Sequence, residues 1–274
     1  NDVTLRLAES ETLGLVGESG CGKSTLSRLA VRLIKPDSGQ INLLGTDMAS
    51  VRGRELRILR RSIQMVFQDP YSSFDPSKTI GASVSEPLRV HEGANGQQRR
   101  KAAQRLLAQT GLGSHVIDRY PAELSGGQRQ RAAIARALAL SPKVVVADEP
   151  VSALDVSIQA DIINLLRDVQ AEHGLSYIFV SHDLSAVRVI SHRVAVMYRG
   201  RVVEQATTEE LYENPKHPYT RFLLQTTPNP TPWREQRQTT AARPEAADDE
   251  PDPLGCGYAS RCPIAIDRCR VEVP

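Results

Sequence analysis

The sequence has little that would mark a membrane-embedded, nucleic-acid-binding or disulfide-stabilised protein. Among its 274 residues, no apolar run approaches the roughly 18 residues that a membrane-spanning helix requires. The 34 Lys and Arg residues nearly balance 32 Asp and Glu residues. The net charge of +2 therefore lacks the overall excess of basic residues that is typical of nucleic-acid-binding proteins. If the protein works at a membrane, it therefore does so through a partner.

Cysteine is also scarce, and no signal-peptide pattern is visible. The chain starts at Asn1 and stops at Pro274 without evident terminating logic, so we expect both ends to be cut from a longer protein. One cysteine lies near the amino terminus and three lie near the other end: Cys21, Cys256, Cys262 and Cys269. This distribution does not suggest a disulfide framework, and it fits a reducing cytosol.

Apolar periodicity predicts strands that alternate with helices, which is typical of an α/β fold with a parallel sheet. We expect strands at 2–8, 12–17, 40–44, 64–68, 143–148, 175–181 and 193–197. We expect helices at 23–34, 55–62 and 157–172, and a mostly helical region at 79–123 in which 97–110 is the clearest segment.

The composition changes near residue 228. Residues 226–253 are rich in proline and carry the acidic run 248–250, so we expect a linker or a poorly ordered segment there. A cysteine-bearing C-terminal extension, residues 254–274, follows it.

Residues 17–24 match the phosphate-loop pattern G-x-x-x-x-G-K-[ST] in full. The glycines let backbone N–H groups wrap phosphates, Lys23 supplies charge at the outer phosphates, and the Ser24 hydroxyl ligates Mg²⁺. A glycine-rich turn capped by lysine is the alternative, but an apolar strand before the motif and a helix after it favour nucleotide binding. The predicted nucleotide contacts are Gly17, Glu18, Ser19, Gly20, Cys21, Gly22, Lys23 and Ser24.

Two acids, Asp148 and Glu149, follow the apolar run 144–147. A strand that ends in a carboxylate near the phosphate loop places Asp148 to hold Mg²⁺, and Glu149 can polarise the attacking water as a general base. Two acids could also be an ordinary strand end. A phosphate loop needs a metal-holding acid, however, which favours the catalytic interpretation.

A second phosphate-contacting motif, the pentapeptide LSGGQ at 124–128, lies about a hundred residues after the phosphate loop. Ser125 can cap the helix that follows, and Gly126 and Gly127 let another group approach the free N–H groups at its start. The helix dipole attracts anions to such a helix start. The sequence therefore predicts two separate phosphate-binding motifs, which is more than a single bound nucleotide obviously needs.

Together these motifs resemble those of the ATP-binding cassette (ABC) ATPases, in order and in spacing. The resemblance covers roughly 2–225, and LSGGQ is its most specific part. It rests on Gly17–Thr25, Gln68, Leu124–Gln128, Asp148, Glu149, Ser152–Asp155 and His182. It implies a P-loop NTPase (RecA-like) core with a mainly parallel sheet, an antiparallel β subdomain and an inserted α-helical subdomain at about 79–140, all within a nucleotide-binding domain at 1–225.

The resemblance also assigns roles. It implies that Thr25 joins the nucleotide contacts and that Gln68 senses Mg²⁺ and water at the junction with a transmembrane partner. Asp155 belongs to the family's D-loop, and His182 lies near the γ-phosphate. Taken alone, His182 is more typical of a surface or capping histidine, but its position after the strand at 177–181 favours the catalytic role.

In this family the signature pentapeptide faces the ATP of an opposing subunit. The residues expected to complete a site in another chain are Ser125, Gly126, Gly127 and Gln128. The family usually stacks adenine on an aromatic residue before the first strand. No aromatic precedes Phe67 here, so we expect that residue to be lost with a truncated amino terminus.

Three segments, 67–76, 214–220 and the cysteine tail, resemble ATPase subunits of oligopeptide, dipeptide and nickel importers. This implies an ATP-hydrolysing subunit on the cytoplasmic face of the inner membrane. Its partners would be a second ABC ATPase subunit, identical or different, two transmembrane permease subunits and, indirectly, an extracytoplasmic solute-binding protein, but no nucleic acid. The alternatives are an exporter cassette and a DNA-maintenance or translation ATPase, which usually splits or duplicates the cassette.

The C-terminal cysteines have two interpretations. Cys256, Cys262 and Cys269 could ligate an iron–sulfur cluster, which normally takes four ligands. Members of the importer group can carry a [4Fe–4S] cluster here with a fourth cysteine further on, but this chain ends first. Their spacing does not match the usual zinc pairs, and free or packed thiols are the alternative.

Overall fold

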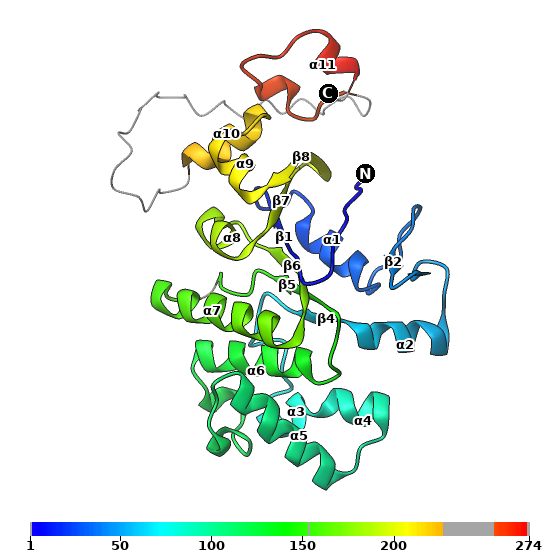
Figure 1. Cartoon of the computed structure of the whole chain (residues 1–274), viewed down its shortest axis with the longest axis vertical. Helices are drawn as coiled ribbons and strands as arrows, with labels where there is room; N and C mark the ends of the chain where they lie inside the picture. Colours follow the sequence, from blue (N-terminus) through cyan, green and yellow to red (C-terminus); the bar gives the residue numbers. More distant parts are fainter. Residues whose placement is uncertain (1, 153, 227–254, 273–274) are drawn as a thin grey trace.

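The computed structural model describes residues 2–152, 154–226 and 255–272 (Figure 1). Its strands are β1 Thr12–Val16, β2 Asn42–Leu43, β3 Thr46–Asp47, β4 Ile63–Val66, β5 Val144–Asp148, β6 Ser176–Val180, β7 Arg193–Tyr198 and β8 Arg201–Thr207. Its α-helices are α1 Lys23–Ala30, α2 Gly53–Ser62, α3 Ile80–Val84, α4 Glu86–Glu92, α5 Gly96–Gln109, α6 Gly126–Leu138, α7 Val156–His173, α8 Leu184–Ile190, α9 Thr208–Glu213, α10 Pro218–Thr226 and α11 Arg268–Val271.

Six strands form the main sheet, in the order β4-β5-β6-β1-β7-β8. The first five are parallel, and β8 runs antiparallel to β7. Strand β1 lies between β6 and β7, and all five of its residues are buried. A parallel strand that is covered on both faces reads as a continuous apolar run, which is why β1 and β5 show no alternation of polar residues.

Helices cover the sheet on both faces, with α1 and α2 on one side and α7 and α8 on the other (Figure 1). The residues of β5 divide between the two layers. Val146 packs with Val31 beside α1, whereas Val145 belongs to the large hydrophobic cluster that includes Leu166 of α7. Because β5 runs parallel to β4 and β6, Asp148 at its end and Glu149 directly after it lie at the carboxyl edge of the sheet.

Helices α3 to α6 lie together at one end of the molecule (Figure 1). Helices α5 and α6 both begin with capping boxes, formed by Asn95 with Gln98 and by Ser125 with Gln128. Each box satisfies donors that a helix start otherwise leaves unpaired. The short β2–β3 hairpin and the β7–β8 pair supply the antiparallel part of the fold.

The strand expected at 2–8 is wrong, because these residues form no strand. The alternating side chains of Val3, Leu5 and Leu7 do turn inward and pack against the cluster around Leu13. The backbone of this segment is hydrogen-bonded by side chains rather than by a neighbouring strand. For example, Ser176 Oγ donates to a main-chain carbonyl oxygen 2.9 Å away. The alternation of apolar and polar residues therefore indicated which side of the segment is buried, although the segment forms no hydrogen-bonded ladder with another strand.

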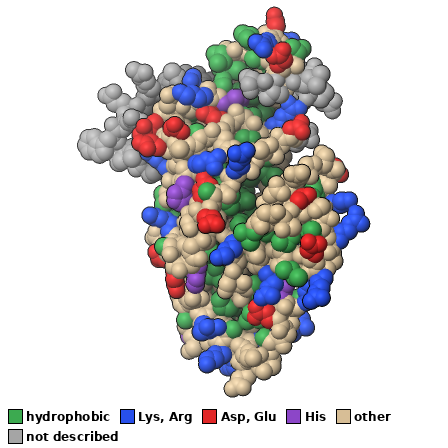
Figure 2. Space-filling model, turned by 45° about the vertical axis from the view of Figure 1, so that its right-hand side comes forward, with side chains coloured by type: hydrophobic (Ala, Val, Ile, Leu, Met, Phe, Trp, Pro, Cys, Tyr) green, Lys and Arg blue, Asp and Glu red, His purple; other side chains and the backbone are tan. Residues whose placement is uncertain are grey.

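Among the described helices, none is long and apolar enough to cross a membrane. Positive and negative side chains are interspersed over the face shown in Figure 2. The predicted linker at 226–253 lies, apart from residue 226, outside the described residues.

Candidate active site

The phosphate loop connects β1 to α1 and depends on glycines. Gly17, Gly20 and Gly22 have φ angles of 154°, 81° and 103°. A Cβ atom on Gly17 would lie 2.2 Å from the Met197 carbonyl oxygen, so no other residue fits there. Helix α1 starts without a side-chain cap, which leaves its first N–H groups available for an anion.

Lys23 closes this loop from inside. Its side chain is buried, and Nζ donates to the carbonyl oxygens of Gly17 at 2.7 Å and Glu18 at 2.9 Å. Neutral carbonyls rather than a carboxylate therefore satisfy the ammonium group. Its positive charge remains uncompensated by these partners and suits a phosphate ligand.

Two oxygen ligands suited to Mg²⁺ lie beside the loop. Ser24 Oγ donates to Asp148 Oδ1 at 3.2 Å, and only 2% of Asp148 is exposed. Burial raises the pKa of the Asp148 carboxyl, because a desolvated carboxylate is costly. A hydroxyl and a carboxylate are ligands that a hard divalent cation prefers, so the residues present fit the expected Mg²⁺.

Glu149 lies at the centre of the second cluster. Gln68 Nε2 donates to Glu149 Oε2 at 3.0 Å, and His182 Nδ1 lies 3.3 Å from the same oxygen. The three residues follow β4, β5 and β6, three adjacent strands whose carboxyl ends share one edge. The predicted catalytic residues Gln68, Glu149 and His182 thus come together in the structure.

The backbone of Glu149 is held in an uncommon conformation. Its φ is 47°, and its N–H donates to the Val180 carbonyl oxygen at 2.9 Å. Ser152 Oγ donates to the Glu149 carbonyl oxygen at 3.1 Å. A non-glycine residue keeps this left-handed conformation only where the surrounding structure holds it firmly. Such residues are common at active sites. The carboxylate can accept a proton from a water molecule at the sheet edge.

The signature residues lie at the start of α6. Ser125 is exposed and serves as the helix cap, whereas Gly127 is buried. A Cβ atom on Gly127 would lie 2.7 Å from Ile158 Cγ2 of α7, and one on Gly126 would lie 3.3 Å from Leu154 Cδ2. Within the described ranges, no hydrogen bond joins residues 124–128 to the phosphate loop. Hydrogen bonds therefore do not link the two predicted phosphate-binding motifs within the described residues.

The expected D-loop lies between β5 and α7. Ala153 falls outside the described residues, and Asp155 is exposed at the start of α7 without a capping hydrogen bond from its side chain. Gln159 Nε2 donates to the carbonyl oxygens of Val151 and Leu154, both at 3.0 Å. These bonds attach the segment to α7.

Sequence reasoning missed two residues that contact the phosphate loop. The hydroxyl of Tyr219 accepts a hydrogen bond from the Glu18 N–H at 2.9 Å, and Arg261 Nη1 lies 3.7 Å from the Glu18 carboxylate. The sequence of 217–219 indicates only a turn packed by an aromatic ring. Nothing local in the sequence signals a contact 201 positions away.

The C-terminal cysteines do not form a metal site in the described part of the chain, where no group of three metal-ligating side chains could hold an ion. All three are free, and Cys256 and Cys262 pack against the main hydrophobic cluster. Burial, followed by the proximity of the other two cysteines, raises the pKa of Cys262. The residues present therefore fit packed thiols rather than a cluster.

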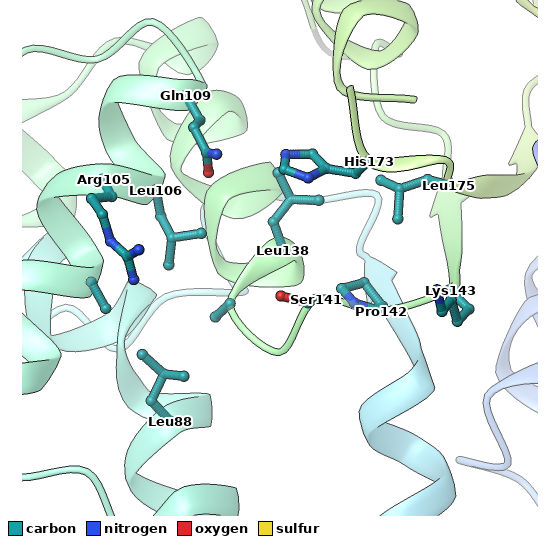
Figure 3. Close-up of a pocket in the computed structure, with 12 residues that line it drawn as sticks. Leu88, Arg105, Leu106, Gln109, Leu138, Ser141, Pro142, Lys143, His173 and Leu175 are labelled. Atoms are coloured by element: carbon teal, nitrogen blue, oxygen red, sulfur yellow. The ribbon is translucent and has the colours of Figure 1, made fainter. Parts of the chain in front are cut away.

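The cavity drawn in Figure 3, with a volume of about 360 Å³, lies away from these residues. Leu106, Leu138 and His173 contribute to its lining, together with Lys143, which directly precedes β5. The cavity is therefore beside the amino end of β5, whereas the candidate active site is at the carboxyl end of the same strand.

Comparison with known proteins shows the class. The model of the ABC transporter family matches residues 1–152, and that of the oligopeptide/dipeptide transporter C-terminal region matches residues 203–269. The chain belongs to the ABC transporter family, whose ATPases bind ATP with Mg²⁺, and its fold is that of the family's P-loop cassettes. The fold class predicted from the sequence is thereby confirmed.

Individual relatives have more specific names than the family as a whole. The chain is 51% identical to a probable peptide ABC transporter ATP-binding protein of Sinorhizobium fredii, over 100% of this chain and 77% of that protein. It is 49% identical to the oligopeptide transport ATP-binding protein OppF of Escherichia coli, over 99% of this chain and 82% of that protein. The cassette MJ0796, in a dimeric structure bound to ADP and phosphate, matches with a TM-score of 0.68 and 34% identity, over 74% of this chain and 88% of that one.

Proposed function

We propose that this chain is the ATP-hydrolysing subunit of an ABC importer for peptides or related small solutes. The observation that carries the proposal is the Glu149 carboxylate, with Gln68 and His182 beside it at the edge of the sheet where β5 ends. The match to the oligopeptide/dipeptide C-terminal region and the names of the relatives support peptides as cargo.

In the proposed reaction, the N–H groups of 17–25 and the Lys23 ammonium bind the ATP phosphates. Ser24 and Asp148, joined by the amide oxygen of Gln68, would hold Mg²⁺, which neutralises phosphate charge when bound. Glu149 accepts a proton from the water whose oxygen attacks the γ-phosphorus. The bond from the γ-phosphorus to the leaving oxygen of ADP then breaks, and ADP and phosphate are released.

We also propose that Asp155 and the signature residues Ser125, Gly126, Gly127 and Gln128 serve the nucleotide of a second cassette, identical or different. The dimeric structure of MJ0796 with ADP and phosphate supports this arrangement. Two permease subunits would place the chain on the cytoplasmic face of the inner membrane, and a solute-binding protein would deliver cargo from outside. The proposed division is a nucleotide-binding domain at 1–225 with its helical subdomain at about 79–140, a linker at 226–253 and the C-terminal extension at 254–274.

A [4Fe–4S] cluster at Cys256, Cys262 and Cys269 stays a prediction that the described residues do not support. Iron and sulfide analysis of anaerobically purified full-length protein tests it. Bound iron and sulfide in near-stoichiometric amounts would favour the cluster, and their absence would leave the packed thiols.

The transport proposal is tested on the assembled complex, purified through a tag on this chain and reconstituted into liposomes. We expect two integral-membrane partners to co-purify. We expect ATP supplied on the side of this chain to drive peptide movement toward that side. Lys23→Ala should abolish both hydrolysis and uptake. Movement of peptide away from the side of the chain would indicate an exporter, and purification without any integral-membrane partner would refute both transport readings.

A further inference from the structure

The segment after the cassette reaches back to the phosphate loop through one tyrosine. Tyr219 lies near the start of α10 and is fully buried, with 0% of its surface exposed. Its hydroxyl oxygen accepts the Glu18 N–H at 2.9 Å. Burial raises the pKa of Tyr219 above its ordinary value.

The contact involves the same peptide unit that receives the phosphate-loop lysine. The Glu18 N–H and the Gly17 carbonyl belong to one planar peptide group. Tyr219 binds its N–H side, and Lys23 Nζ donates to its carbonyl oxygen at 2.7 Å. When a phosphate draws the Lys23 ammonium away, Tyr219 is the partner that still fixes the orientation of this peptide.

Tyr219 packs between one aromatic ring of the cassette, Tyr198 of β7, and one of the C-terminal extension, Tyr258. The rings of Tyr198, Tyr219 and Tyr258 pack together, with centroids 4.6 to 5.4 Å apart. Tyr258 lies in the described part of that extension and is 2% exposed. Aromatic pairs at these distances prefer tilted or edge-on geometry, which all three pairs show.

The same extension contacts the loop directly. Arg261 lies 3.7 Å from the Glu18 carboxylate and donates to the Tyr198 hydroxyl at 3.5 Å. The Arg261 side chain is only 14% exposed, whereas that of Glu18 is 42% exposed. The ion pair is partly screened by water, so the buried Tyr219 hydrogen bond is the stronger of the two links.

We propose that Tyr219 is a positioning residue for the phosphate loop, and that it makes ATP affinity depend on the packing of residues 255–272 against the cassette. This inference rests on the proposed function, because it concerns the same nucleotide site. It adds a role for a segment that contributes no atom to the proposed hydrolysis.

Tyr219→Phe tests the link, because it removes one hydroxyl and leaves the Glu18 N–H without its partner. We expect the dissociation constant of the full chain for MgATP, measured by calorimetry, to rise about fivefold, which corresponds to about 1 kcal/mol. Turnover of the assembled complex at saturating ATP should change less than twofold. The matched control is Tyr177→Phe, since the Tyr177 hydroxyl is also buried but has no hydrogen-bond partner within the described residues.

Two arginine variants test the extension. Arg261→Gln should raise the same constant about twofold, whereas Arg270→Gln, an equal charge change at an exposed position of the same extension, should leave it unchanged. Equal constants for Tyr219→Phe and Tyr177→Phe would overturn the positioning role, and equal effects of Arg261→Gln and Arg270→Gln would overturn the link to the extension. Lys23→Ala distinguishes failure of the proposed nucleotide site from failure of the positioning role of Tyr219. If Lys23→Ala binds MgATP like the wild type, the proposed nucleotide site itself is wrong.

Discussion

The role of Glu149 leads to the most specific prediction. Glu149→Gln keeps the shape of the side chain and replaces the carboxylate, which can accept a proton, with a neutral amide. Gln68 Nε2 and His182 Nδ1 both approach Glu149 Oε2, at 3.0 and 3.3 Å, and the amide oxygen of the variant can still accept from a donor there. The geometry of the site and the phosphate loop should therefore be preserved, and ATP binding with it.

The magnitude follows from the loss of proton transfer. Removing a general base typically lowers a rate by a factor of about 10² to 10⁴, or roughly 3 to 5 kcal/mol in activation free energy. We expect this loss in phosphate release by the assembled transporter at saturating ATP. The dissociation constant for MgATP should stay within about twofold of the wild type, because the binding contacts are untouched.

A surface acid supplies the control. Glu172 is exposed near the end of α7, close to the start of β6 and at the opposite edge of the sheet from Glu149. Glu172→Gln removes the same charge and should leave turnover unchanged. A Glu149→Gln variant that hydrolyses ATP within threefold of the wild-type rate would refute the assignment of Glu149 as the base.

Two further predictions concern packing and pH. Gly127→Ala places a methyl group 2.7 Å from Ile158 Cγ2, so it should lower the free energy of unfolding by about 1 to 3 kcal/mol, and Ile158→Ala in the same chain should recover part of that loss in denaturant titrations. Burial lowers the pKa of His217, whose Nδ1 accepts the Tyr219 N–H. Because the unfolded chain then binds the proton first, stability should fall as pH drops below about 6.5, and His217→Gln should show a flatter dependence of melting temperature on pH. A wild-type melting temperature that falls no more steeply than that of the variant would contradict this reasoning.

The parts of the site that the sequence predicted are those whose chemistry is local. The phosphate loop needs glycines, a lysine and a serine within eight consecutive positions, so its residues could be read directly. Asp148 ends a buried strand and Glu149 follows it, and the carboxyl ends of parallel strands share an edge, so their place beside the loop was also predictable. The grouping of Gln68 and His182 with Glu149 came from the family resemblance.

Contacts between distant segments carried no such signal. The Tyr219 contact with Glu18 joins positions 201 residues apart, and neither residue stands out in the local pattern. The same limit explains the wrong strand at 2–8, since alternation of Val3, Leu5 and Leu7 reports which side is buried but not whether a neighbouring strand is present to pair with.

The central claim is that each ATP is gripped by the phosphate loop of one cassette and the signature motif of another. Ser125→Arg puts a bulky cation at the exposed start of α6. In the dilute isolated chain, we expect its dissociation constant for MgATP to stay within about twofold of the wild type, because the phosphate loop alone binds there. In the assembled transporter, the same variant should lower turnover at least tenfold. If affinity of the isolated chain fell as strongly as turnover of the transporter, Ser125 would act on the nucleotide of its own chain, and the shared-site account would be wrong.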